Sequence, residues 1–218
     1  MNDTARRDEA VIELIGALTY GLLHSFEAGS RAVTKAPTVE LADRQASFAA
    51  EELERYRVLR ARLNDLTDRP DEAFVAFRAT LDAFYDEARA DEWLESQVFH
   101  FIGDTITTDF AELLAPRVDT ETADAVRRAL TGRVAQEAFA LQQITDAIAR
   151  EGDAAQARVA RFAGVMIGQA MNRLRDALLH SDALQLVIGD EDVKEIVLEL
   201  LGRHRERLER LGLDTLGD

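Results

Sequence analysis

Apolar and polar residues alternate with the period of an amphipathic helix along almost the whole chain. In the first segment, Ile12, Ile15, Leu18 and Leu22 follow one another at spacings of three and four residues, so they share one helical face. The same periodicity predicts helices over residues 7–34, 38–67, 71–88, 91–115, 120–150, 153–181 and 184–212, with Gly189 as a point of interruption in the last. Short loops between these segments favour antiparallel packing of successive helices.

The ends of these segments carry residues that helix ends prefer. The predicted N-caps are Thr38, Asp119 or Thr120, Asp153 and Ser181. All three prolines fall between periodic segments, and good helix formers dominate the rest of the chain. We therefore expect an all-α protein, and its 218 residues suit one domain over 1–218.

Charge and composition exclude several classes of function. The net charge of −15 opposes binding to phosphate backbones and anionic membrane surfaces, so nucleic acid is not expected as a partner. The segment "GRHRERLER" at 202–210 alternates arginine with glutamate, which is typical of a solvated helix face with paired charges. Without cysteine there are no disulfides or thiolate sites. No apolar run approaches the ~20 residues of a membrane span and no signal-peptide core is present, so we expect a cytoplasmic protein.

Four acidic residues fall on or beside the predicted apolar stripes. Glu52 lies four residues after Phe48 and four before Tyr56, in the middle of its stripe. Glu27 adjoins the stripe of the first helix, one turn beyond Leu23. Asp109 is predicted to face inward with Ile102, Ile106 and Leu113, and Glu137 with Leu130, Val134, Leu141 and Ile144. Asp104, by contrast, is predicted to share a face with His100 and Thr108.

Buried carboxylates need a compensating proton, cation or metal ion. A single glutamate at the edge of an apolar stripe is ordinary, but four such acids on four long helices indicate a site. Inward carboxylates from four facing helices, two of them in Glu-x-x-His turns, are how ferritin-like bundles hold a pair of iron or manganese ions.

Three stretches carry a resemblance to a known family. They are "YGLLHSFEAGSRAVTKAPTVELADRQASFAAEELERYRVLRARL", "DEWLESQVFHFIGDTITTDFAELLAP" and the closing "RLERLGL". With these stretches the chain resembles the actinobacterial ferritin-like proteins related to tRNA-modifying di-iron hydroxylases. The resemblance implies a ferritin-like four-helix bundle with additional C-terminal helices, and oxygen-dependent hydroxylation at a di-iron centre.

The resemblance also assigns ligand positions. The family's acid on the first helix corresponds to Glu27 and its acid on the third to Asp109, while its Glu-x-x-His on the second corresponds to Glu52 followed by Arg55. On the fourth helix the family's histidine falls near Gln136, or at Ala140 if the motif is counted from Glu137. Neither alignment restores a histidine.

Arg55 changes the expected chemistry, because a guanidinium has no free lone pair and stays protonated. We therefore predict that Glu52 is a vestigial ligand neutralised by Arg55 in a buried ion pair. His24, one turn before Glu27, is the remaining candidate for a histidine ligand, although an isolated helical histidine is more often a hydrogen-bonded core residue.

The expected function is that of a bundle protein with a degenerate di-iron site, no cofactor and a structural or interaction role, acting as a homodimer. The alternative is an oxidase or hydroxylase whose all-carboxylate di-iron or di-manganese centre uses Glu27, Glu52, Asp109 and Glu137. A third possibility, a tRNA-binding module, is opposed by the net charge.

Overall fold

The computed structural model describes residues 3–213, apart from the side chains at 176, 178–180 and 190–193. Within these residues every regular element is helical. The α-helices are α1 (Asp3–Val33), α2 (Val39–Leu66), α3 (Val75–Glu87), α4 (Trp93–Val98), α5 (Asp104–Leu114), α6 (Thr120–Leu130), α7 (Arg133–Glu151), α8 (Asp153–His180), α9 (Asp182–Ile188) and α10 (Asp190–Arg210). Single 3-10 turns occupy η1 (Glu72–Phe74) and η3 (Ala115–Arg117), and a π-helical turn occupies η2 (Phe99–Gly103).

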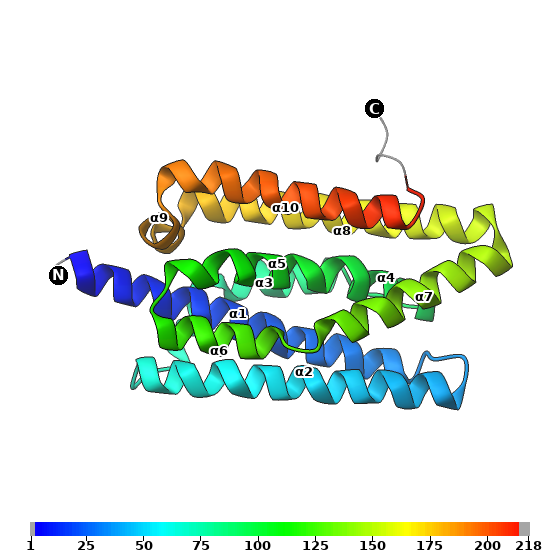
Figure 1. Ribbon diagram of the computed structural model, residues 1–218, viewed down its shortest axis with the longest axis horizontal. Coiled ribbons are helices and arrows are strands. Elements are labelled where there is room, and N and C mark those ends of the chain that lie inside the picture. Colours follow the sequence, from blue (N-terminus) through cyan, green and yellow to red (C-terminus); the bar gives the residue numbers. More distant parts are fainter. Residues whose placement is uncertain (1–2, 214–218) are drawn as a thin grey trace.

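The helices form a four-helix bundle with further helices along one side. Long α1 and α2 pack against each other, α2 contacts α6, and α4 contacts α7, so the third and fourth bundle elements are α4–α5 and α6–α7. Figure 1 shows α8 and α10 running together along the opposite side of the molecule from α2. The expected all-α bundle with additional C-terminal helices is therefore confirmed. None of the described helices has the length and apolarity needed to cross a membrane.

Three of the predicted N-caps are confirmed. The side chains of Thr38, Asp119 and Ser181 each accept a hydrogen bond from a backbone N–H three residues later. Asp153 is wrong as an N-cap, because Gly152 occupies that position with φ of +63° and Asp153 is already helical. Gly189 interrupts the last predicted helix as expected, with φ of +85° between α9 and α10.

Two long predicted helices are divided in the structure. The segment 91–115 contains the π-helical turn η2, which has more residues per turn than an α-helix and so rotates the side chains that follow it. The segment 120–150 is broken at Gly132, whose φ of +85° ends α6 and starts α7 in a new direction. The stripe predicted from Leu130 through Val134 is therefore wrong, and Val134 is 81% exposed.

Helix α10 carries a histidine that lies buried within the structure. His204 is 2% exposed, and neither of its ring nitrogens has a hydrogen-bond partner among the described residues. Burial, together with the charge of Arg207, lowers the pKa of the imidazole to about 4, although Asp109 acts in the opposite direction. The folded protein thus holds His204 neutral at pH values where an exposed histidine is partly charged.

We expect His204 to make the fold acid-sensitive. Between its ordinary pKa of 6.5 and its folded pKa of about 4, the unfolded chain binds a proton that the folded chain does not. The free energy of unfolding should therefore fall as the pH falls, with this group contributing up to about 1.4 kcal/mol per pH unit. Urea denaturation at several pH values should give a flatter profile for His204→Leu than for the unmodified protein. If the free energy of unfolding of both proteins depended on pH in the same way, His204 would not be the source of the acid sensitivity.

Candidate functional site

A fully buried carboxylate lies at the centre of the bundle. Glu52 of α2 is 0% exposed and receives bonds from two guanidinium groups. Arg55, one turn further along α2, donates from Nη1 to Glu52 Oε1 at 2.9 Å. Arg133, the first residue of α7, donates from Nη2 to Glu52 Oε2 at 3.0 Å. Both oxygens of the carboxylate are therefore paired with a cation, one from its own helix and one from the facing helix.

The remaining N–H groups of Arg55 tie α2 to the turn between α6 and α7. Its Nε and Nη2 lie 3.3 and 3.2 Å from the carbonyl oxygen of Thr131, and Nη2 also pairs with Glu51 at 3.1 Å. A Cβ at Gly132 would lie 3.3 Å from Nη2 of Arg55, and the positive φ of this residue disfavours any other side chain. The turn that breaks the predicted helix thus also makes room for the guanidinium.

A second buried carboxylate, Asp104, lies beside the first. Its Oδ1 accepts a hydrogen bond from Ser25 of α1 at 2.7 Å, and its Oδ2 lies 2.7 Å from Nδ1 of His100. On the other side of the imidazole, Nε2 lies 3.2 Å from the amide nitrogen of Gln45. Because that amide donates, the pattern puts the imidazole proton on Nδ1, where it is donated to Asp104. We call Glu52, Arg55, His100, Asp104 and Arg133 the inner network.

The two carboxylates of the inner network differ in how readily they bind a proton. Burial raises the pKa of Glu52, and the negative charge of Asp104 adds to that rise, while Arg133 and Arg55 oppose it. Burial also acts to raise the pKa of Asp104, but its hydrogen bond with His100, the charge of Arg133 and the hydrogen bond from Ser25 outweigh burial and leave the pKa below its ordinary value. Asp104 is therefore the carboxylate more firmly held in its ionised form.

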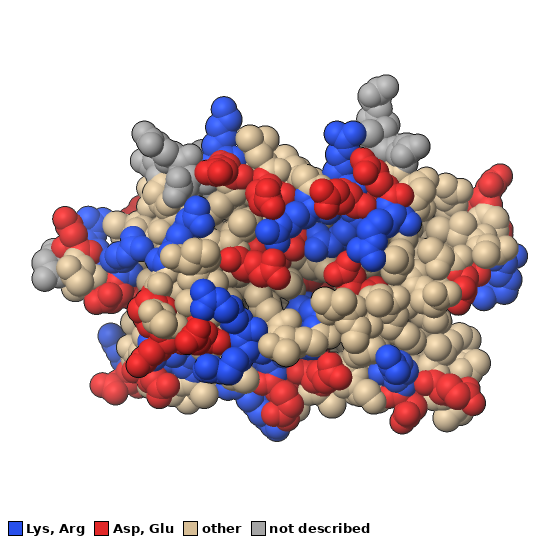
Figure 2. Space-filling view, in the orientation of Figure 1, with Lys and Arg blue, Asp and Glu red and all other residues tan. Residues whose placement is uncertain are grey.

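Arginines of α10 cover a third buried carboxylate. Asp109 of α5 is 3% exposed and accepts two bonds from Arg207, at 2.6 and 2.9 Å, and one from Arg203 at 3.3 Å. Arg210 pairs with Glu137 of α7 at 2.7 Å. Figure 2 shows that basic and acidic side chains alternate along this face of the molecule, which is hollowed between α10 and the bundle.

The structure brings only part of the predicted acid set into the interior. Glu52 and Asp109 are buried as expected. Glu27, predicted to lie beside the apolar stripe, does not reach the interior, because its side chain is 51% exposed and pairs with Arg31 on the same helix. Glu137 lies at the edge of the interior, 24% exposed, because Gly132 ends the helix on which its register was counted.

His24 does not reach the predicted acids. Its Nε2 lies 3.1 Å from Asp82 of α3, and its ring stacks on Tyr85 with centroids 4.4 Å apart. The imidazole is thus a half-buried packing residue between α1 and α3. The side chain of His180, the last residue of α8, lies outside the described residues.

Comparison with protein-family models agrees with this architecture. The model of the ferritin-like domain of actinomycetes matches residues 5–191, from the start of α1 to the start of α10. The chain belongs to this ferritin-like family. No curated protein matches its sequence. The matched region ends before residues 203–210, so the arginines of α10 that cover Asp109 lie outside it.

The interior of this ferritin-like protein does not fit a di-metal centre. In metal-binding bundles, carboxylates and histidines from four helices converge on the ions. Here both oxygens of Glu52 are already paired with guanidinium groups, which cannot ligate a cation. Asp109 is paired in the same way with Arg207. Among the side chains that the structure describes, no three histidine or acidic residues are grouped so that they could hold an ion.

Sequence reasoning missed several members of the site. The predicted shared face of Asp104 and His100 is confirmed by their contact at 2.7 Å, but this face is buried, whereas the apolar period, in which the π-helical turn before Asp104 is not visible, set it apart from the inward acids. Arg133 was missed because the sequence predicted one continuous helix over 120–150, where nothing in the apolar pattern marked it as a partner of Glu52. The segment 202–210 is only partly a solvated face: Arg205 pairs with Glu209 on the outside, whereas Arg207 is 12% exposed and points to Asp109.

The Arg55→Ala substitution should destabilise the fold strongly. It removes one of the two cations beside a carboxylate that is 0% exposed, and it leaves the carbonyl of Thr131 without two donors. We expect a loss of about 3–5 kcal/mol in the free energy of unfolding, towards the lower end because Arg133 remains. The matched control is Arg57→Ala, since Arg57 lies two residues away on α2, is 60% exposed and pairs with Glu54 on the surface. Denaturant titration of both variants should give a loss below about 0.5 kcal/mol for the control. Equal losses of stability in Arg55→Ala and Arg57→Ala would show that Arg55 does not neutralise Glu52 in a buried ion pair.

Proposed function

We propose that this ferritin-like protein is a non-catalytic member of its family with a structural or interaction role, in which arginine has taken the place of a metal ion. The observation that carries the proposal is the pairing of Glu52 with both Arg55 and Arg133. The family resemblance puts a Glu-x-x-His turn where the chain has Glu52 and Arg55. A cation is therefore still present beside this carboxylate, but it is a guanidinium without redox or Lewis-acid chemistry.

Such a network can persist after its original chemistry is lost. Removing one partner of a buried ion pair leaves the other charge uncompensated, at a cost of several kcal/mol. Each member of the inner network is therefore retained for stability even if no reaction depends on it. The link to tRNA-modifying hydroxylases rests on the sequence resemblance and enters the proposal as ancestry, with no tRNA chemistry attached to the present residues.

The competing enzyme function has less support. An all-carboxylate centre made of Glu27, Glu52, Asp109 and Glu137 requires four acids to converge. Glu27 lies on the surface with Arg31, and Glu137 pairs with Arg210 at the edge of the interior.

We further propose, from the sequence, that the protein acts as a cytoplasmic homodimer. Size-exclusion chromatography coupled to light scattering measures the mass in solution and distinguishes the 24.3 kDa chain from its dimer.

Metal analysis tests the proposal directly. Protein purified from cells supplemented with iron or manganese should contain far less than one metal ion per chain by inductively coupled plasma mass spectrometry. The Glu52→Gln variant should give the same background content, because Glu52 is not a ligand. About two metal ions per chain in the unmodified protein, lost in Glu52→Gln, would instead establish the di-metal centre and overturn the proposal.

A further inference from the structure

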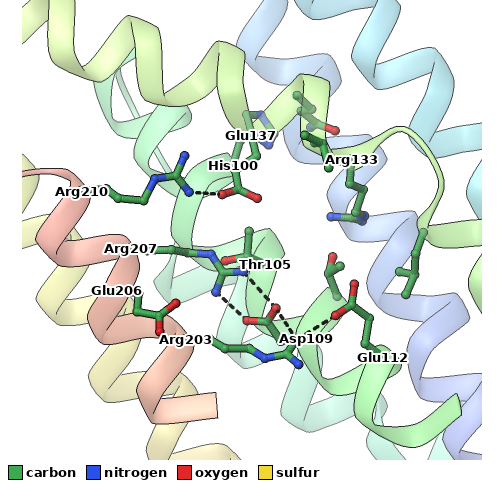
Figure 3. Close-up of a pocket in the computed structure, with 14 residues that line it drawn as sticks. His100, Thr105, Asp109, Glu112, Arg133, Glu137, Arg203, Glu206, Arg207 and Arg210 are labelled. Atoms are coloured by element: carbon green, nitrogen blue, oxygen red, sulfur yellow. Dashed lines mark hydrogen bonds and ion pairs between the residues drawn. The ribbon is translucent and has the colours of Figure 1, made fainter. Parts of the chain in front are cut away.

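A cavity of about 280 Å³ lies between α5, α7 and α10, over the inner network. Figure 3 shows the arginines of α10 on one side of this hollow and Arg133 on the other, with Asp109 and Glu112 along one wall. Four arginines and four carboxylates line it, so their formal charges cancel. In a chain with a net charge of −15, this cavity is a place that a negatively charged ligand can approach without net repulsion from the residues around it.

The arginines of α10 are occupied by carboxylates. Arg207 makes a two-bond pair with Asp109, Arg203 pairs with Asp109 and Glu112, and Arg210 pairs with Glu137. Figure 3 shows these interactions as dashed lines across the α10 side of the hollow. These guanidinium groups therefore have their principal acceptors within the protein.

Arg133 differs from them because it is buried and has spare donors. Its side chain is 10% exposed, and its guanidinium points into the hollow in Figure 3. Its Nη2 is bonded to Glu52 at 3.0 Å, its Nη1 is 3.5 Å from the carbonyl oxygen of Asp104, and its Nε has no acceptor among the described residues. The Nε is enclosed by protein atoms, but Nη1 and Nη2 each carry two N–H groups and make one bond to the described residues, so each keeps one N–H for a further acceptor.

The backbone at this point adds to the positive potential. Arg133 is the first residue of the 19-residue helix α7, which begins after Gly132 without a side-chain cap and without an acidic residue in its first turn. The helix dipole at a start without a side-chain cap favours an anion, and Val134 and Gln136 of this first turn line the cavity.

We propose that this cavity binds a small metabolite through an oxyanion, either a carboxylate or a phosphate, held by Arg133 at the start of α7. The volume of about 280 Å³ lies at the lower end of ligand pockets and suits a small molecule. The oxyanion supplies the acceptor that the spare N–H groups of Arg133 lack, and a planar guanidinium matches either oxyanion with two parallel bonds. Metal content and anion binding are measured separately, so this proposal and the proposed loss of metal chemistry can fail independently.

Isothermal titration calorimetry of the full chain with inorganic phosphate and, separately, with succinate tests the proposal. We expect one site per chain for at least one probe, with a Kd of about 1 mM or tighter in a buffer of low ionic strength, and weaker binding as salt is added. Binding of phosphate alone identifies a phosphate-bearing ligand, and binding of succinate alone identifies a carboxylate. Binding of neither probe overturns the proposal.

Variants locate the bound anion. Arg133→Gln should weaken binding about tenfold or more, and Arg133→Lys, which keeps the charge but loses the planar donor pair, should weaken it less. Unchanged binding by Arg133→Gln would overturn the assignment. Because Arg133 also supports Glu52, a second pair of variants is placed at Val134, which lines the cavity and is 81% exposed. Val134→Glu should weaken anion binding by charge repulsion, whereas Val134→Gln, which has the same shape without the charge, should not. Equal anion affinities of the two variants would show that the anion does not bind in this cavity.

Discussion

The pairing of Glu52 with two guanidinium groups is the interaction on which the interior of this bundle depends. A carboxylate that is 0% exposed cannot remain ionised in an apolar core without partners, and Arg55 and Arg133 supply them from α2 and α7. The arrangement constrains the backbone as well, because Arg55 also needs the carbonyl of Thr131 and the space beside Gly132. One ion pair therefore fixes how α2 faces the turn between α6 and α7.

The second buried carboxylate extends this constraint to the other bundle helices. Asp104 accepts from Ser25 of α1 and from His100 at the start of the π-helical turn, and His100 in turn contacts Gln45 of α2. Gln45 also accepts a hydrogen bond from Gln97 of α4. Arg133 of α7 joins them by donating to Glu52 and to the carbonyl of Asp104, so all four bundle elements are linked by polar side chains in the core. Polar cores of this kind favour a single arrangement of helices, because any other arrangement leaves buried groups without partners.

Around this core, α10 adds a second layer of charge that is partly open to solvent. Its arginines neutralise Asp109 and Glu137 from outside the bundle, and the cavity lies between this layer and the inner network. The outer arginines are satisfied within the protein, whereas Arg133 belongs to both layers and is only partly satisfied. This difference in hydrogen bonding is what distinguishes a purely structural cation from one able to accept a ligand.

The sequence by itself determined the helical class, most helix boundaries and the burial of Glu52 and Asp109, because apolar periodicity and side-chain caps are local signals. It also predicted the partnership of Glu52 with Arg55, since residues three apart on a helix are neighbours. Tertiary structure alone decided the rest. The π-helical turn before Asp104 and the break at Gly132 change the helical register without changing composition, so the face shared by His100 and Asp104 is buried and Val134 is exposed, both against expectation. Arg133 and the arginines of α10 reach their acids across 73 to 98 residues of chain, and contacts at such separations are set by helix packing, which no local pattern encodes.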